Sequence, residues 1–125
     1  MTLRECYEEL GADYEDVVRR FMNEERVDRF LTMLLKDDSF AQLRDAMERE
    51  DAELAFRGAH SLKGIGMNLG LTGLAEAAGA LTEELRQGKM STEAETLFQD
   101  LEKCYKNTVN LIDKLLKPEG NTGES

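Results

Sequence analysis

The segment DAELAFRGAHSLKGIGMNLG, residues 51–70, contains His60, the only histidine of the chain. Its pattern predicts one continuous helix. Asp51 suits the N-cap, because its carboxylate can accept hydrogen bonds from backbone N–H groups that the first turn leaves unpaired. Gly70 suits the C-terminal end, where a residue without a Cβ atom is favoured. The function of the chain is predicted to depend on this helix.

The predicted helix has two distinct faces when successive residues are placed 100° apart. The face opposite His60 is an apolar stripe that predicts the buried side, formed by Ala55, Gly58, Leu62, Ile65 and Leu69. The face of His60 is expected to be exposed, and its other members are Phe56, Arg57, Lys63, Gly64 and Met67. This arrangement predicts a titratable ring on the surface, between two cations.

Three glycines fall inside the predicted helix, at positions 58, 64 and 66. Each costs roughly 1 kcal/mol relative to alanine, so each calls for a packing or functional reason. Gly58 and Gly66 lie away from His60 and predict the close approach of neighbouring helices. Gly64 follows His60 by one turn on the same face. The missing side chain there is expected to leave the imidazole open to a large partner.

The sequence AHSLKG, residues 59–64, is followed by Gly70, Leu71 and Leu74. This pattern resembles the signature of histidine-containing phosphotransfer (HPt) domains, which is A-H-x-L-K-G, five variable residues, G-L, and a leucine three residues further on. A looser similarity extends over about residues 30–85. The resemblance implies a helical bundle whose histidine carries a phosphoryl group between receiver-domain aspartates in a multistep two-component phosphorelay.

The resemblance also implies roles for residues of this chain. His60 would be the phosphoacceptor, Lys63 the charge partner of the phosphoryl group, and Gly64 the residue that gives access. Thr82 stands where the family often has a glutamine or glutamate in contact with the imidazole, which makes it a candidate for support of the ring. The implied partners are response-regulator receiver domains and a hybrid sensor kinase.

Residue chemistry agrees with these roles. A neutral imidazole is a competent nucleophile near pH 7, and an ammonium one turn along, at Lys63, can neutralise phosphoryl oxygens. Arg57, one turn back, could support the site or steer a partner. Phe56 and Met67 would surround the imidazole with an apolar docking surface. The sequence has no nucleotide-binding motif, which predicts a carrier without a cofactor, and the partner would supply the divalent metal.

Composition and charge narrow the possible functions. The chain has 125 residues, the size of one domain, and a formal net charge of −10, which argues against nucleic acid as a partner. None of the 26 acidic residues lies between Glu53 and Glu76, and that acid-free window suits an incoming anion or an acidic partner. No apolar run approaches the roughly 20 residues of a membrane span.

The N-terminus and the cysteines indicate the compartment. MTLRECYEEL has neither the basic start nor the apolar region of a signal peptide. Cys6 and Cys104 fit no metal or redox spacing, so they are predicted to be reduced core residues of a cytosolic protein. We therefore expect a cytoplasmic monomer with no membrane segment.

The rest of the chain predicts helices at a period of 3.6 residues. They cover residues 3–10, 13–22, 24–36, 40–49, 71–87 and 92–117, with a break or kink at residues 37–39. In the second of these, Val17, Val18, Phe21 and Met22 form the apolar side, and Phe30 belongs to the stripe of the third. Thr92 and Glu95 match a capping box. Pro118 ends the last helix.

These elements predict an all-α domain over residues 1–117, an antiparallel four-helix bundle with additional short N-terminal helices, followed by a disordered tail at residues 118–125. Two other classes of function compete with that of a phosphoryl carrier. A carboxylate-bridged metal bundle would need Glu-x-x-His pairs on two helices, and one histidine cannot supply them. A helical adaptor that binds receiver domains without phosphotransfer stays open. A phosphorylated receiver domain would lose its phosphoryl group to a carrier but not to an adaptor.

Overall fold

The structure is a computed structural model that describes residues 1–117, and within that range it consists of seven helices without a strand. The helices are α1 (Leu3–Glu9), α2 (Tyr14–Phe21), α3 (Glu24–Lys36), α4 (Ser39–Glu48), α5 (Ala52–Asn68), α6 (Thr72–Leu85) and α7 (Thr92–Leu116). The predicted all-α class is confirmed. The predicted disordered tail, residues 118–125, lies outside the described residues.

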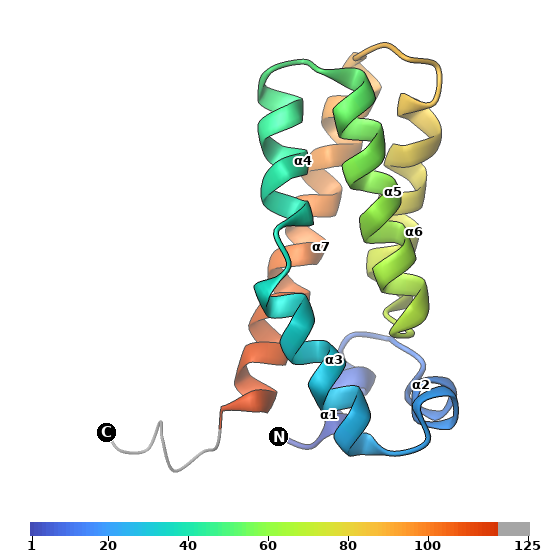
Figure 1. The fold of residues 1–125 in the computed structure, drawn as a ribbon, viewed down its shortest axis with the longest axis vertical. Helices are drawn as coiled ribbons and strands as arrows, with labels where there is room; N and C mark the ends of the chain where they lie inside the picture. The colour runs from blue at the N-terminus through green and yellow to red at the C-terminus, as the bar shows by residue number, and fades with distance from the viewer. Residues whose placement is uncertain (118–125) are drawn as a thin grey trace.

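Four of the helices form a bundle, and three form its base. Figure 1 shows α4, α5, α6 and α7 side by side along the long axis, with α1, α2 and α3 at the lower end. The 25-residue helix α7 extends through both parts, so it contacts α6 at one end and α1 and α3 at the other. The predicted four-helix bundle with short N-terminal helices is therefore confirmed.

The helix boundaries follow from local capping chemistry. The side chains of Thr2, Asp13 and Asp51 each accept a backbone N–H in the first turn of α1, α2 and α5, which confirms the predicted cap at Asp51. Gly70 follows α5 with a φ of +67°, a left-handed conformation that favours glycine. The predicted break between α3 and α4 is also present, and there the Asp37 carboxylate accepts the Ser39 N–H at 2.7 Å.

The N-terminal cap of α7 differs from the prediction by one residue. Ser91, not Thr92, is the N-cap, and its hydroxyl oxygen accepts the Ala94 N–H at 3.0 Å. Adjacent serine and threonine are both competent caps, so the local pattern does not decide between them. The choice is set by a tertiary contact, because the Ser91 hydroxyl also donates to the Glu84 carboxylate at 2.9 Å.

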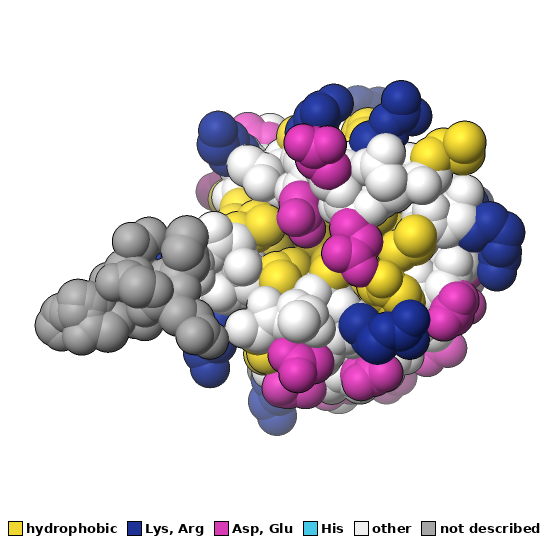
Figure 2. All heavy atoms as spheres, turned by 90° about the horizontal axis from the view of Figure 1, so that it is seen from below, with side chains coloured by type: hydrophobic (Ala, Val, Ile, Leu, Met, Phe, Trp, Pro, Cys, Tyr) yellow, Lys and Arg dark blue, Asp and Glu magenta, His cyan; other side chains and the backbone are white. Residues whose placement is uncertain are grey.

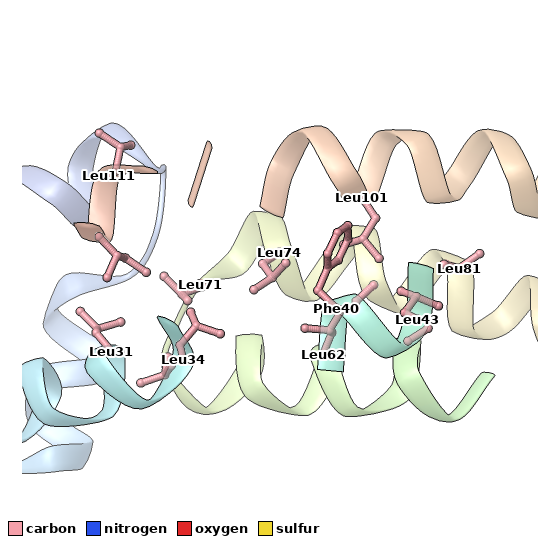
Figure 3. Packing of buried hydrophobic residues seen from close by; sticks show 14 of the residues in the cluster. Leu31, Leu34, Phe40, Leu43, Leu62, Leu71, Leu74, Leu81, Leu101 and Leu111 are labelled. Atoms are coloured by element: carbon pink, nitrogen blue, oxygen red, sulfur yellow. The ribbon is translucent and has the colours of Figure 1, made fainter. Parts of the chain in front are cut away.

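A continuous apolar core fills the bundle and joins it to the base. Figure 3 shows leucines of α3, α5, α6 and α7 pointing into it, together with Phe40 at the start of α4. Two apolar residues that were predicted to be buried lie outside this core. Met22 is 74% exposed because it follows α2 with a φ of +79°, which takes its side chain out of the helical stripe. Phe30 is 40% exposed and packs on the ring of Phe21.

The buried face of α5 is rotated from the predicted stripe. Leu62, Ala55 and Leu69 are buried as predicted, but Ala59 and Gly66 are buried as well, whereas Gly58 and Ile65 are only half-buried. The rotation arises because α5 packs against α6 as well as α4. The face of His60 stays on the surface.

Two glycines of α5 lie at helix crossings, which confirms their predicted packing role. A Cβ atom on Gly58 would lie 3.0 Å from Leu43 Cβ of α4, and one on Gly66 would lie 2.8 Å from Ala75 N of α6. At the second crossing the neighbour is backbone, which a side-chain rotation cannot relieve. The glycines therefore allow α5 to approach both neighbours closely.

The end of the molecule formed by α1, α2 and α3 has a mixed surface. Figure 2 shows both acidic and basic side chains around apolar side chains on this face, rather than a continuous basic patch.

Within residues 1–117, none of the helices combines the length and the apolar character needed to span a membrane.

Candidate functional site

The imidazole of His60 lies on the exposed face of α5, beside the ring of Phe56. The two ring centroids are 6.0 Å apart and the ring planes differ by only 9°. Phe56 is half-buried and packs against the core, so its position is set by the fold. The imidazole is therefore supported on one side by a fixed aromatic ring and is open to solvent on the other.

Lys63 reaches across the neighbouring helix instead of pointing straight into solvent. A Cβ atom on Gly79 of α6 would lie 3.6 Å from Lys63 Cδ and 3.7 Å from Lys63 Cε. Gly79 therefore leaves the space in which the aliphatic part of Lys63 lies. Among the ion pairs within 4.0 Å that residues 1–117 form, none involves Lys63. Lys63 follows His60 by three residues on α5, and its ammonium has no ion-pair partner among these residues.

Gly64 lies beside His60 on an open part of the surface. A Cβ atom at this position would meet no atom within 4 Å, the imidazole included. An alanine methyl would therefore fit without contact beyond the neighbouring residues and backbone of its own helix. Any obstruction by a side chain at position 64 must act on an approaching partner, or come from a side chain longer than alanine.

Arg57, Thr82 and Met67 are less directly connected with the imidazole. Arg57 is exposed and pairs with Glu53, one turn back, at 3.1 Å. Thr82 is fully buried and its hydroxyl donates to the Ala78 carbonyl at 2.7 Å, within its own helix. Met67 is 55% exposed and extends the apolar surface of the His60 face. Of these three residues, Arg57 and Met67 are accessible to a partner, whereas Thr82 is not.

Two charged residues of the site were not identified from the sequence, one in α6 and one at the C-terminal end of α6. Arg86 places its guanidinium 5.2 Å from the centroid of the Phe56 ring, and it donates to both carboxylate oxygens of Glu83, at 3.2 and 2.8 Å. Arg86, and secondarily Lys63, lower the pKa of Glu83. The acid-free window of the sequence is therefore not acid-free in space, because α6 brings Glu83 to the His60 face.

The charge on Glu83 persists over a wide pH range. A lowered pKa means that the carboxylate stays ionised at neutral and mildly acidic pH, and that its pairing is lost only as the pH falls through that lowered value. Glu83 and Arg86 are both exposed, so their pair is screened by solvent. The pair therefore contributes little to stability, and it matters to the site because Glu83 lies near Lys63.

Residues 1–117 contain no group of three or more His, Cys, Asp or Glu side chains that could hold a metal ion. The site itself brings together a nucleophilic ring, an ammonium and a guanidinium–carboxylate pair. Such a set can accept a charged group on the imidazole and neutralise it.

Comparison with protein families gives a match over most of the chain. The family model described as Hpt domain matches residues 25–115, which include all of α4, α5 and α6 and nearly all of α3 and α7. Comparison with curated proteins and with solved structures gave no match. The matched range contains His60 and every other residue of the site.

Proposed function

Because this chain belongs to the Hpt domain family, whose members carry phosphoryl groups in phosphorelays and interact with receiver domains and kinases, we propose that His60 is its phosphoacceptor. The observation that supports this most directly is the surroundings of the ring. The imidazole is exposed, Phe56 supports it, Gly64 leaves its approach open, and Lys63 has no ion-pair partner among the described residues.

In the proposed step, the unprotonated ring nitrogen of His60 attacks the phosphorus atom of a receiver aspartyl phosphate. A P–N bond forms while the P–O bond to the aspartyl carboxylate breaks, and the carboxylate leaves with the electron pair. The other ring nitrogen keeps its proton. Catalysis of phosphoryl transfer depends on position and charge, and Lys63 supplies positive charge to the phosphoryl oxygens. The reverse step returns the group to a second receiver.

The partners follow from the same chemistry. Receiver domains, including that of a hybrid sensor kinase, would dock on Phe56 and Met67 and bring the divalent metal with them. The chain would act as a monomeric carrier rather than as an enzyme with its own substrate. We place it in the cytoplasm, where free thiols such as those of Cys6 and Cys104 are the normal state.

The test is transfer from a receiver domain that carries a radiolabelled aspartyl phosphate. We expect the receiver to lose its label while this chain gains it in equal amount. A helical adaptor would bind the receiver and leave the label in place, so retention of the label in a complex that demonstrably forms would favour the adaptor function over the carrier function.

Removal of the Lys63 charge should slow phosphoryl transfer or shorten the lifetime of the phosphohistidine. Lys63→Ala tests this, and the free energy of unfolding should change by less than about 0.5 kcal/mol, as for most surface substitutions. Because the aliphatic chain of Lys63 lies against Gly79, Lys63→Met is the sharper variant: it keeps that chain and removes only the ammonium. Transfer kinetics of both variants equal to those of the parent would show Lys63 to be a solvated surface residue.

A further inference from the structure

A carboxylate of this chain can compete with the phosphoryl group for the ammonium of Lys63. The aliphatic part of Lys63 crosses α6 at Gly79, and Glu83 follows Gly79 by four residues, one turn along the same face of α6. A carboxylate in that place can attract the ammonium. If Glu83 held Lys63, the cation would be neutralised before a phosphoryl group reached His60.

The structure shows Glu83 held by a different residue. Arg86 binds both of its carboxylate oxygens, with Nε at 3.2 Å from Oε1 and Nη2 at 2.8 Å from Oε2. Two charge-assisted hydrogen bonds fix the carboxylate more firmly than a single contact would. Arg86 is itself placed by the ring of Phe56, which lies 5.2 Å from its guanidinium carbon. Both oxygens of the Glu83 carboxylate are thereby engaged by Arg86, and Lys63 lies near enough to lower the pKa of Glu83 without forming an ion pair with it.

We infer that Arg86 is a positioning residue, which keeps Lys63 available to the phosphoryl group by holding Glu83. This inference rests on the proposed function of His60, and it deepens that function by naming what controls its charge partner. Arg86 acts through two other side chains and needs no contact with the reacting atoms.

A double-mutant cycle tests the inference. Arg86→Ala should slow transfer to His60 by about two- to fivefold, the rate equivalent of one exposed ion pair, because Glu83 is then free to bind Lys63. Glu83→Gln should transfer at least as fast as the parent. The double variant should recover the parent rate although it also lacks Arg86. In a Lys63→Met background, Arg86→Ala should cause no further loss.

A matched control separates the effect of Arg86 on transfer from a general effect of removing an exposed, paired arginine. Arg49→Ala removes the same charge and breaks a similar exposed pair, with Asp45 at 3.0 Å on α4, and it should transfer like the parent. A double variant as slow as Arg86→Ala would overturn the inference, because Arg86 would then act through Phe56 or on the phosphoryl group directly. Parent-like transfer by Arg86→Ala would overturn it as well.

A crystal structure of Arg86→Ala gives a readout that does not depend on transfer. We expect Lys63 Nζ within hydrogen-bond distance of the Glu83 carboxylate, and a separation like that of the parent would contradict the inference. If the parent itself takes no label, the proposed function fails. Capture of Lys63 by Glu83 is still decided by that structure, so the two failures are distinguishable.

Discussion

The His60→Gln variant should take no phosphoryl label from a phosphorylated receiver domain, whereas the parent should become labelled. Glutamine has no nucleophilic ring nitrogen, and His60 is the only histidine of the chain, so the loss should be complete. His60 is exposed on α5, and substitutions at such positions usually change stability by less than about 0.5 kcal/mol. Thermal melts of both proteins would show that the variant remains folded.

The chemistry of the label provides the control. A phosphoryl group on an imidazole nitrogen should survive base and be lost in acid. Ser61 is the adjacent exposed nucleophile, and a phosphate ester there would survive acid, so Ser61→Ala should keep the parent's label. Label that persists in His60→Gln would contradict the assignment of the phosphoacceptor.

Alanine at two glycines of the same helix should have opposite effects on stability. Gly64→Ala should raise the free energy of unfolding by roughly 1 kcal/mol, because alanine is the better helix former and its Cβ meets no atom within 4 Å. Gly66→Ala should lower it by about 1–3 kcal/mol, the usual cost of overpacking, because its Cβ would lie 2.8 Å from the backbone nitrogen of Ala75. Urea denaturation measures both.

Substitutions at Gly64 also separate effects on stability from effects on phosphoryl transfer. Gly64→Ala should be somewhat slower in transfer, and Gly64→Gln should remain folded but be nearly inert, because a long side chain there obstructs the in-line approach of a receiver aspartyl phosphate. Parent-like transfer by Gly64→Gln would show that access is not the reason for this glycine. Unfolding of both Gly64 variants would show that position 64 has a packing role instead.

Local sequence patterns predicted much of this fold, because the features that they predicted depend on neighbouring residues along the chain. Asp51 caps α5 and Gly70 ends it because each needs only its own neighbours along the chain. The opposition of His60 to Leu62 follows directly from the helical period. Gly58 and Gly66 were identified as crossing points because glycine inside a helix needs an external reason.

The residues that the sequence analysis missed depend on the register between helices. Glu83 and Arg86 reach the site only because α6 pairs with α5 so that Gly79 meets Lys63 and Arg86 meets Phe56. No local pattern contains that register. The same limit explains the rotated face of α5 and the choice of Ser91 over Thr92 as a cap, since both are decided by a neighbouring helix.

The close crossings at Gly58 and Gly66 have a consequence for the energetics of a carrier. With α5 in contact with Leu43 on one side and Ala75 on the other, the backbone beneath His60 has little room to shift when the ring gains or loses a charged group. In the proposed function, the backbone would then reorganise little both when the phosphoryl group arrives and when it leaves. In the proposed relay, one rigid surface would serve donor and acceptor alike, and the direction of net flow would be set by the free energies of the two aspartyl phosphates.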